Sequence, residues 1–129
     1  MKPIKLDFSI TDPILMIDGK IVPSPIENAA PYQGLDLGDK ILVLYLRYGA
    51  GKCDPSLMNS NIIAFDRQGK ILWRAQGVSE IDPNNIFSRQ PYYTLGFDEE
   101  LNEVWGEGNT RAVFDLETGK IVRKYGDFR

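Results

Sequence analysis

The sequence predicts an all-β protein in which two antiparallel sheets pack together and helix is scarce. The main evidence is a hairpin pattern that occurs at 16–22, 64–73 and 113–122: an apolar run, an aspartate, a turn ending in Gly-Lys and a second apolar run. Extended flanks, an aspartate in the turn and a glycine able to take positive φ are the chemistry of a β-hairpin. Short apolar segments about ten residues apart, without a 3.6-residue apolar period, also favour strands.

The N-terminal segment, residues 1–31, is expected to be irregular apart from one short hairpin. Residues 1–12 read as a loose lead-in, and Ile14 to Val22 can form a hairpin over Asp18 and Gly19. Three prolines then interrupt regular structure: Pro23, Pro25 and Pro31. We therefore expect this segment to lie on the sheet that follows it.

The first sheet is expected to occupy about 32–76. Ile41 to Tyr48 is the most hydrophobic strand, and both of its faces carry mainly apolar side chains, so it should be a central strand covered on both sides. A long polar loop follows from Gly49 to Asn59. Asn61 to Asp66 and Lys70 to Gln76 are the next two strands.

The second sheet is expected to occupy about 92–125. Its four strands are Tyr92–Phe97, Asn102–Gly106, Arg111–Asp115 and Lys120–Tyr125. Gly77 to Pro91 separates the two sheets, and one helical turn near Glu80 to Phe87 is the only helix expected. A chain of 129 residues is long enough for one domain with a core, so residues 1–129 should form a single domain.

The two longer hairpin segments resemble the blade signature of quinoprotein-like β-propellers, in which Ala-apolar-Asp, a Thr-Gly-Lys turn and a downstream Trp recur. One copy matches at Ala64, Asp66, Gly69, Lys70 and Trp73, with a turn one residue shorter and no Thr. The other matches at Asp115, Thr118, Gly119 and Lys120, with Arg123 in the place of the Trp.

Length limits what this resemblance implies. A blade takes about 40–45 residues and rings usually have four to eight blades, so this chain has room for two blades and a hairpin. The resemblance therefore implies a half β-propeller with open sheet edges. It does not imply a quinone, which sits at the centre of a closed ring, and we expect no cofactor. Open edges offer a partner a strand to pair with.

Composition indicates a cytoplasmic protein with neither a nucleic-acid nor a membrane partner. The net charge is −3 and the pI is about 4.9, whereas nucleic-acid binders usually present a basic face. No apolar run approaches the roughly 20 residues of a membrane-spanning helix. The N-terminus lacks the apolar core of a signal peptide, and the single Cys53 cannot form an internal disulfide.

The residue inventory also argues against an enzyme. There is no histidine, which is the commonest general base and metal ligand, and one cysteine is too few for a zinc site or a redox pair. The Gly-Ala-Gly-Lys run at 49–52 departs from a phosphate-binding loop at Leu46, Cys53 and Pro55, so it is interpreted as a connection between strands. We therefore expect no catalytic residues and no metal.

A cluster of acidic residues supplies the candidate binding site. It contains Asp98, Glu99, Glu100, Glu103 and Glu107, with no intervening base. The spacing is not that of a calcium loop, and nothing fixes the separation of a catalytic carboxylate pair. Two interpretations stay open: a solvated turn, and a docking surface for a basic partner whose negative field has no internal counter-charge.

Aromatic and basic residues surround this cluster. Tyr92 and Tyr93 are neighbours on a strand and point to opposite faces, so one should be an exposed interface anchor. The other large aromatics are expected in the inter-sheet core: Tyr45, Tyr48, Trp73 and Trp105. Five basic residues near the C-terminus are expected to pair with Asp115, Glu117 and Asp127; they are Arg111, Lys120, Arg123, Lys124 and Arg129.

Three classes of function remain. In size and character the chain resembles the immunity proteins that protect bacteria from contact-dependent growth-inhibition toxins. That resemblance implies an inhibitor that binds a basic toxin domain, such as a nuclease, and covers its active site. The first alternative is a non-catalytic interaction or self-assembling β-module. The second is a small carboxylate-based hydrolase.

Overall fold

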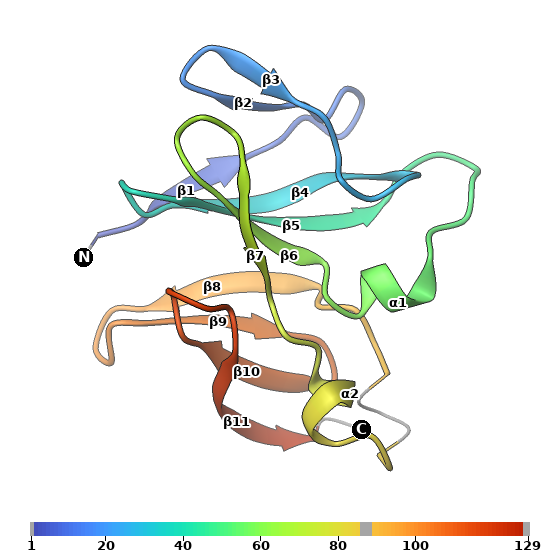
Figure 1. Cartoon of the computed structure of the whole chain (residues 1–129), viewed down its shortest axis with the longest axis vertical. Helices are drawn as coiled ribbons and strands as arrows, with labels where there is room; N and C mark the ends of the chain where they lie inside the picture. Colours follow the sequence, from blue (N-terminus) through green and yellow to red (C-terminus); the bar gives the residue numbers. More distant parts are fainter. Residues whose placement is uncertain (1, 86–88, 128–129) are drawn as a thin grey trace.

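The computed structural model describes residues 2–85 and 89–127, which form three antiparallel sheets and two short helices (Figure 1). The expected all-β class is therefore confirmed. Residues 86–88, at the end of the segment where a helical turn was expected, and Arg129 lie outside the described residues.

The first sheet has five strands in the order β1-β4-β5-β6-β7. Their bounds are Ile4–Asp7, Ala29–Asp36, Ile41–Arg47, Ile62–Phe65 and Ile71–Arg74. A separate hairpin of β2 (Leu15–Ile17) and β3 (Lys20–Val22) covers one face, as the sequence predicted. Figure 1 shows this hairpin above the sheet and the second sheet below it.

The second sheet has four strands in the order β11-β10-β9-β8. Their bounds, from β8 to β11, are Thr94–Asp98, Glu103–Glu107, Thr110–Phe114 and Ile121–Asp127. Strands β4 to β7 and β8 to β11 each pair in chain order, and the Asp…Gly-Lys hairpin joins the last two strands of each sheet. The two sheets therefore repeat one topology.

The N-terminal segment is more regular than predicted. β1 pairs with β4 from Gln33 to Asp36, and β4 already begins at Ala29. Pro31 is tolerated within β4 because it lies beside a bulge and beyond the stretch paired with β1, where β4 is an edge strand. The amino-acid composition of residues 1–12 did not indicate β1. An edge strand can form with only a few backbone hydrogen bonds, and these do not require a particular side-chain pattern.

Two helices of one turn each connect the strands. α1 (Pro55–Met58) lies in the segment expected to be a loop, and the Asp54 carboxylate caps it by accepting from Ser56 N at 2.9 Å. α2 (Val78–Ile81) lies at the expected break between the sheets, and Glu80 accepts from Gly77 N at 2.7 Å.

β5 is the central strand of the molecule, as predicted. Residues 41–45 are at most 3% exposed, and their side chains alternate between two cores. Leu42 and Leu44 face the core between the two sheets, whereas Val43 and Tyr45 face the core under the β2–β3 hairpin. Both faces of this strand are therefore apolar because both are covered.

A buried side-chain amide joins the two sheets. Asn61, just before β6, has no exposed surface; its Nδ2 donates to Tyr45 O and to Tyr92 O, both at 2.8 Å. Its Oδ1 accepts from Tyr92 N at 2.9 Å. Tyr92 is where the chain enters the second sheet, so this amide satisfies backbone groups that no strand pairs.

Two glutamines make similar connections elsewhere between the sheets. Gln33 Oε1 on β4 accepts from Leu95 N on β8 at 2.8 Å. Gln76 Oε1 accepts from Ile121 N on β11 at 3.0 Å. In each case a side chain of the first sheet bonds to the backbone of the second, which leaves the inner side chains of the second sheet free to be apolar.

Two side chains from the first sheet hold the turn between β10 and β11 by hydrogen bonds. The carbonyl oxygen of Leu116 accepts from Lys40 Nζ at 2.8 Å and from Trp73 Nε1 at 3.0 Å. The Trp73 ring lies against Gly119, where a Cβ would overlap it. Lys40 is 6% exposed and is also flanked by the carboxylates of Asp39 and Glu117, at 3.8 and 3.6 Å.

One arginine joins three turns at the other side of the first sheet. Arg67, in the β6–β7 turn, makes a two-pronged ion pair with Asp18 in the β2–β3 turn, at 2.6 and 3.1 Å. It also bonds to Asp36 at 2.9 Å and to the Gly38 carbonyl at 3.2 Å. Hydrogen bonding to this guanidinium lowers the pKa of the Asp18 carboxyl below its usual value.

We predict that Asn61→Ala lowers the free energy of unfolding by about 3 kcal/mol or more, because three buried backbone groups lose their partners at once. Urea denaturation measures the effect. Asn84→Ala, in an exposed turn, should stay within about 0.5 kcal/mol of wild type. An Asn61→Ala protein as stable as wild type would show that the amide does not join the sheets.

The three hairpin glycines provide a second prediction. Gly19, Gly69 and Gly119 have φ of +83°, +85° and +74°, as the pattern requires. Gly19→Ala has open space and should cost about 1 kcal/mol for the backbone strain alone. Gly119→Ala should cost roughly 1–3 kcal/mol more, because its Cβ would displace the Trp73 ring. Equal melting temperatures for the two variants would contradict this contact.

Candidate functional site

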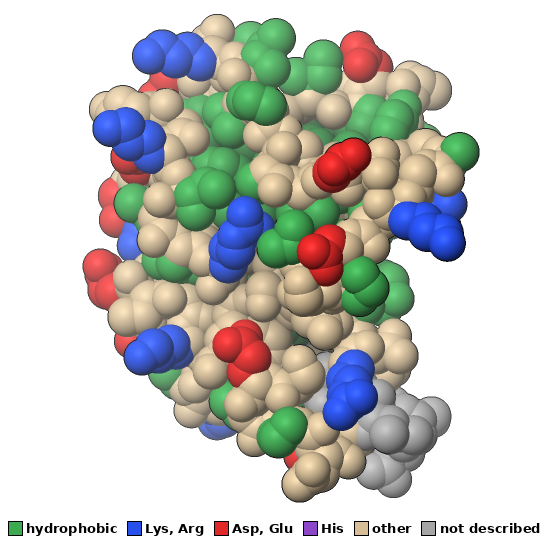
Figure 2. All heavy atoms as spheres, turned by 45° about the vertical axis from the view of Figure 1, so that its right-hand side comes forward, with side chains coloured by type: hydrophobic (Ala, Val, Ile, Leu, Met, Phe, Trp, Pro, Cys, Tyr) green, Lys and Arg blue, Asp and Glu red, His purple; other side chains and the backbone are tan. Residues whose placement is uncertain are grey.

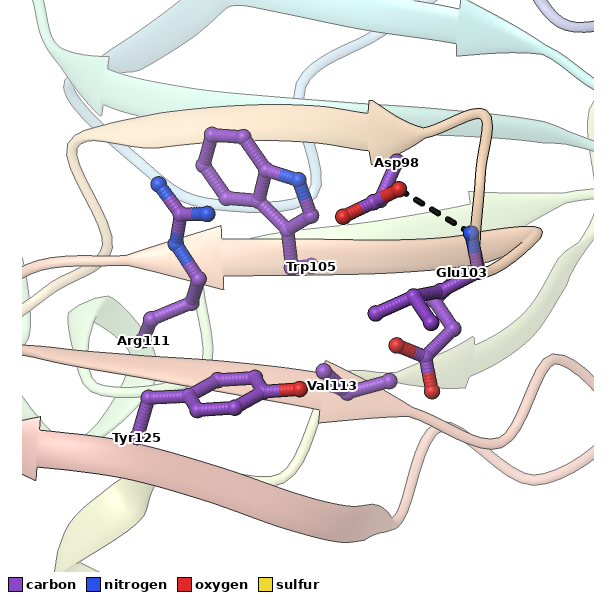
Figure 3. A pocket seen from close by; sticks show the side chains of 7 residues that line it. Asp98, Glu103, Trp105, Arg111, Val113 and Tyr125 are labelled. Atoms are coloured by element: carbon purple, nitrogen blue, oxygen red, sulfur yellow. Dashed lines mark hydrogen bonds between the residues drawn. The ribbon is translucent and has the colours of Figure 1, made fainter.

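The candidate site lies on the face of the second sheet that is turned away from the first. Alternate side chains of β10 separate the two faces: Ala112 and Phe114 enter the core, whereas Arg111 and Val113 face outward. A hollow of about 360 Å³ lies on this outer face. Seven residues line it: Asp98, Leu101, Glu103, Trp105, Arg111, Val113 and Tyr125 (Figure 3).

Trp105 is the central side chain of the outer face. It is paired across the sheet with Gly96 on β8, where a Cβ would overlap the indole. The Arg111 guanidinium lies 3.9 Å from the centroid of the Trp105 ring, a cation–π contact visible in Figure 3. Glu107 accepts from Arg111 Nε at 2.7 Å and keeps the guanidinium over the ring.

A second arginine occupies the edge strand of this face. Arg123 on β11 forms an ion pair with Glu103 on β9 and donates from Nε to the Tyr125 hydroxyl at 2.8 Å. These two contacts raise the pKa of Arg123 above its usual value, with Glu103 the larger cause. Tyr125 is 41% exposed, so its ring adds apolar surface beside the hollow.

The five predicted acids fall into two groups. Asp98, Glu99 and Glu100 form the tip of the β8–β9 hairpin, which we call the acidic tip; Asp98 accepts from Leu101 N at 3.0 Å, while Glu99 and Glu100 are exposed. Glu103 and Glu107 instead pair with arginines. The expectation of a field without internal counter-charge is therefore wrong for β9 and holds at most for the acidic tip.

The partners predicted for Arg111 and Arg123 are also wrong, because these residues pair with Glu107 and Glu103. The reason is that Arg111 and Arg123 share one face of the sheet with Glu107 and Glu103 of β9, whereas the prediction followed proximity in sequence. Lys124 forms an ion pair with Asp82. The side chains of Asp127 and Arg129, which the prediction also involved, lie outside the described residues. Glu117 lies instead near Lys40 of the first sheet.

The two neighbouring tyrosines separate as expected. Tyr93 is 49% exposed, whereas Tyr92 is 2% exposed, packs edge-to-face on Phe114 at 5.4 Å and donates its hydroxyl to Gln76 O at 2.7 Å. Burial raises the pKa of the Tyr92 hydroxyl. Tyr92 therefore belongs to the core and is no longer a candidate binding residue, whereas Tyr93 is exposed.

Sequence reasoning missed Trp105 by assigning it to the inter-sheet core. Trp73 does lie there, and Tyr45 is buried in the other core, but Tyr48 is 45% exposed. The signal that could have placed Trp105 is the alternation of β9. Glu103, Trp105 and Glu107 are two residues apart, so an indole between two carboxylates shares their face.

Comparison with known proteins gives no significant match: no family model, no curated sequence and no solved structure is similar to the chain. Among residues 2–85 and 89–127, no three His, Cys, Asp or Glu side chains gather in a way that would hold a metal ion. Neither α1 nor α2, the helices of the described part, has the length and apolar character needed to span a membrane.

The contact between Gly96 and Trp105 can be tested by NMR. Gly96→Ala should shift the indole N–H resonance of Trp105, because the added methyl overlaps the ring. The resonance of Trp73, whose N–H donates to Leu116 O, is the internal control and should not move. An unshifted Trp105 resonance would show that the indole does not lie on Gly96.

Proposed function

We propose that the chain is an inhibitor of the immunity type. It binds a basic partner protein, such as a nuclease toxin domain, through the outer face of the second sheet and the acidic tip, and covers the partner's active site. The proposal rests mainly on one observation: the outer face corresponds, by the internal repeat, to a face that is buried in the first sheet.

The correspondence follows from strand register. Across β4 to β7 one row of paired residues lies in the inter-sheet core: Leu35, Leu42, Ala64 and Trp73. The equivalent row across β8 to β11 lies on the outer face: Gly96, Trp105, Val113 and Arg123. The first sheet thus uses this face to pack on another sheet, and the second sheet presents it to solvent.

The chemistry of the outer face suits a protein partner. Trp, Tyr and Arg are the residues most often found as energetic anchors of protein interfaces, and Trp105, Tyr125 and Arg111 meet around the hollow. Leu101, 56% exposed, adds an apolar side chain next to the acidic tip. Glu99 and Glu100 would attract a basic surface from a distance, and such attraction mainly raises the association rate.

The repeat also supports the half-propeller interpretation that we include in this proposal. Each sheet contributes a four-stranded antiparallel meander, and the repeated hairpin joins equivalent strands in both. In a propeller, the face of each blade packs against its neighbour. A partner bound to the outer face would take the place of a further blade.

The other two classes receive less support. Self-assembly through strand edges is partly blocked at β8, which is an edge strand. The N–H of Leu95 on this strand already donates to Gln33 and cannot pair with a strand of another copy. A carboxylate-based hydrolase would need two free acids facing one another, whereas Glu103 and Glu107 are bound by arginines. Sedimentation analysis distinguishes the inhibitor from the self-assembling module: a monomer favours the inhibitor, and an oligomer favours the self-assembling module.

A toxin-domain gene directly upstream would supply the partner, and its absence would contradict the immunity function. With that domain as the probe, replacing Asp98, Glu99 and Glu100 by Lys should slow association about tenfold at low salt and remove most of its salt dependence. Trp105→Ala should act differently and speed dissociation, because it removes a buried anchor. Protection of cells from the toxin should fall in both variants.

A matched control has the same change of charge elsewhere. Asp7, Asp12 and Glu27 are exposed, and none of them lies on the second sheet. Their triple replacement by Lys should leave most of the association rate and all of the dissociation rate unchanged. Equal effects of the two triple variants would mean that only net charge matters, and unchanged kinetics in the tip and Trp105 variants would exclude the outer face.

A further inference from the structure

A polar recess lies away from the outer face, where the first sheet meets the β10–β11 turn. It has a volume of about 350 Å³, at the small end of the range for small-molecule sites, about 300–1,000 Å³. Its walls come from both sheets and both helical segments; they include Ser60, Arg74, Gln76, Glu80, Thr118 and Lys120. On the face that carries α1 and α2, charged side chains are scattered singly (Figure 2).

Arg74 differs from the other arginines of the described residues, each of which donates at least one hydrogen bond. Arg67, Arg111 and Arg123 each pair with a carboxylate, whereas Arg74 has no hydrogen bond or ion pair within the described residues. Its Nη1 is buried without a partner, and its charge acts on the hydroxyl of Tyr45, which is also buried without a partner. A guanidinium cannot lose its proton, and a buried donor without an acceptor is costly, so this position favours a bound anion.

The neighbouring polar groups are arranged as donors. Gln76 Oε1 accepts from Ile121 N, which leaves the Nε2 amide of Gln76 available to donate. Thr118 Oγ1 accepts from Lys120 N, which leaves its hydroxyl proton available. Ser60 adds a hydroxyl and Lys120 an exposed ammonium group. A ligand that fits must therefore be rich in acceptor oxygens.

The charge of the recess is also positive. Glu80 is the one carboxylate among its lining residues, and one of its oxygens accepts from Gly77 N at the start of α2. Against it stand Arg74 and Lys120. We infer that this recess binds a phosphate group, free or on a small molecule, with Arg74 as its main ligand and Lys120, Gln76, Ser60 and Thr118 as additional donors. Phosphate presents several oxygens to donors from different directions, which a carboxylate does not.

The test is a titration of the full chain with inorganic phosphate at constant ionic strength, followed by NMR of the Gln76, Thr118 and Lys120 backbone signals. Wild type should bind phosphate in preference to acetate. Arg74→Gln should weaken phosphate binding at least tenfold, and Lys120→Gln should weaken it severalfold. Lys70→Gln is the matched control, because Lys70 follows Gly69 in the equivalent turn of the first sheet, and it should bind as wild type does.

Three outcomes would overturn the inference. They are the absence of saturable phosphate binding by wild type, equal binding of acetate, and unchanged binding by the Arg74 and Lys120 variants. If Arg74→Gln fails to fold, Lys120→Gln with its Lys70→Gln control still decides the matter, because Lys120 is exposed. Glycerol 3-phosphate, with glycerol as its control, separates an esterified phosphate from the free ion: tighter binding of the ester supports the small-molecule form.

Discussion

The fixed position of the two sheets depends on the buried amide of Asn61. Apolar side chains alone would let two sheets slide over one another at small cost, because the hydrophobic effect has no direction. Asn61 does have direction, since two carbonyls and one N–H must be placed around it together. A partly satisfied buried network is worse than none, so this contact selects one arrangement of the sheets.

The other polar contacts between the sheets follow the same rule. Gln33, Gln76 and Trp73 all reach the backbone of the second sheet rather than its side chains. The second sheet is thereby held from one side only. In the described part of the chain, none of these hydrogen bonds between the sheets comes from a side chain of the outer face, so Trp105, Arg111 and Tyr125 can serve binding instead.

The sequence was informative where structure depends on neighbours along the chain. The three Asp…Gly-Lys hairpins, their glycines and the central strand, which was predicted at 41–48 and found at Ile41–Arg47, follow from alternation and turn chemistry. β1 and β4 were not named as strands: β1 was missed because its strand pairing is non-local, and β4 because it begins within the proline-containing segment expected to be irregular. The outer face was found only in part: the acids were visible as a cluster, but their arginine partners come from β10 and β11, and only the register reveals them. The recess around Arg74 joins segments more than forty positions apart, and no local pattern predicts it.

The placement of Trp73 and Arg123 at equivalent positions bears on polymerisation. Within the molecule, the second sheet packs on one face of the first. The equivalent face of the second sheet is the outer face, so a second copy could dock there, and further copies could continue head to tail into a fibre. The Trp73 indole donates a hydrogen bond to the β10–β11 turn of the second sheet, whereas Arg123 forms an ion pair within its own sheet. At the opposite side of the stack, the β2–β3 hairpin covers the face that a second copy would offer. The pairing of Arg123 within its own sheet and the covered face of the first sheet therefore both work against such head-to-tail assembly.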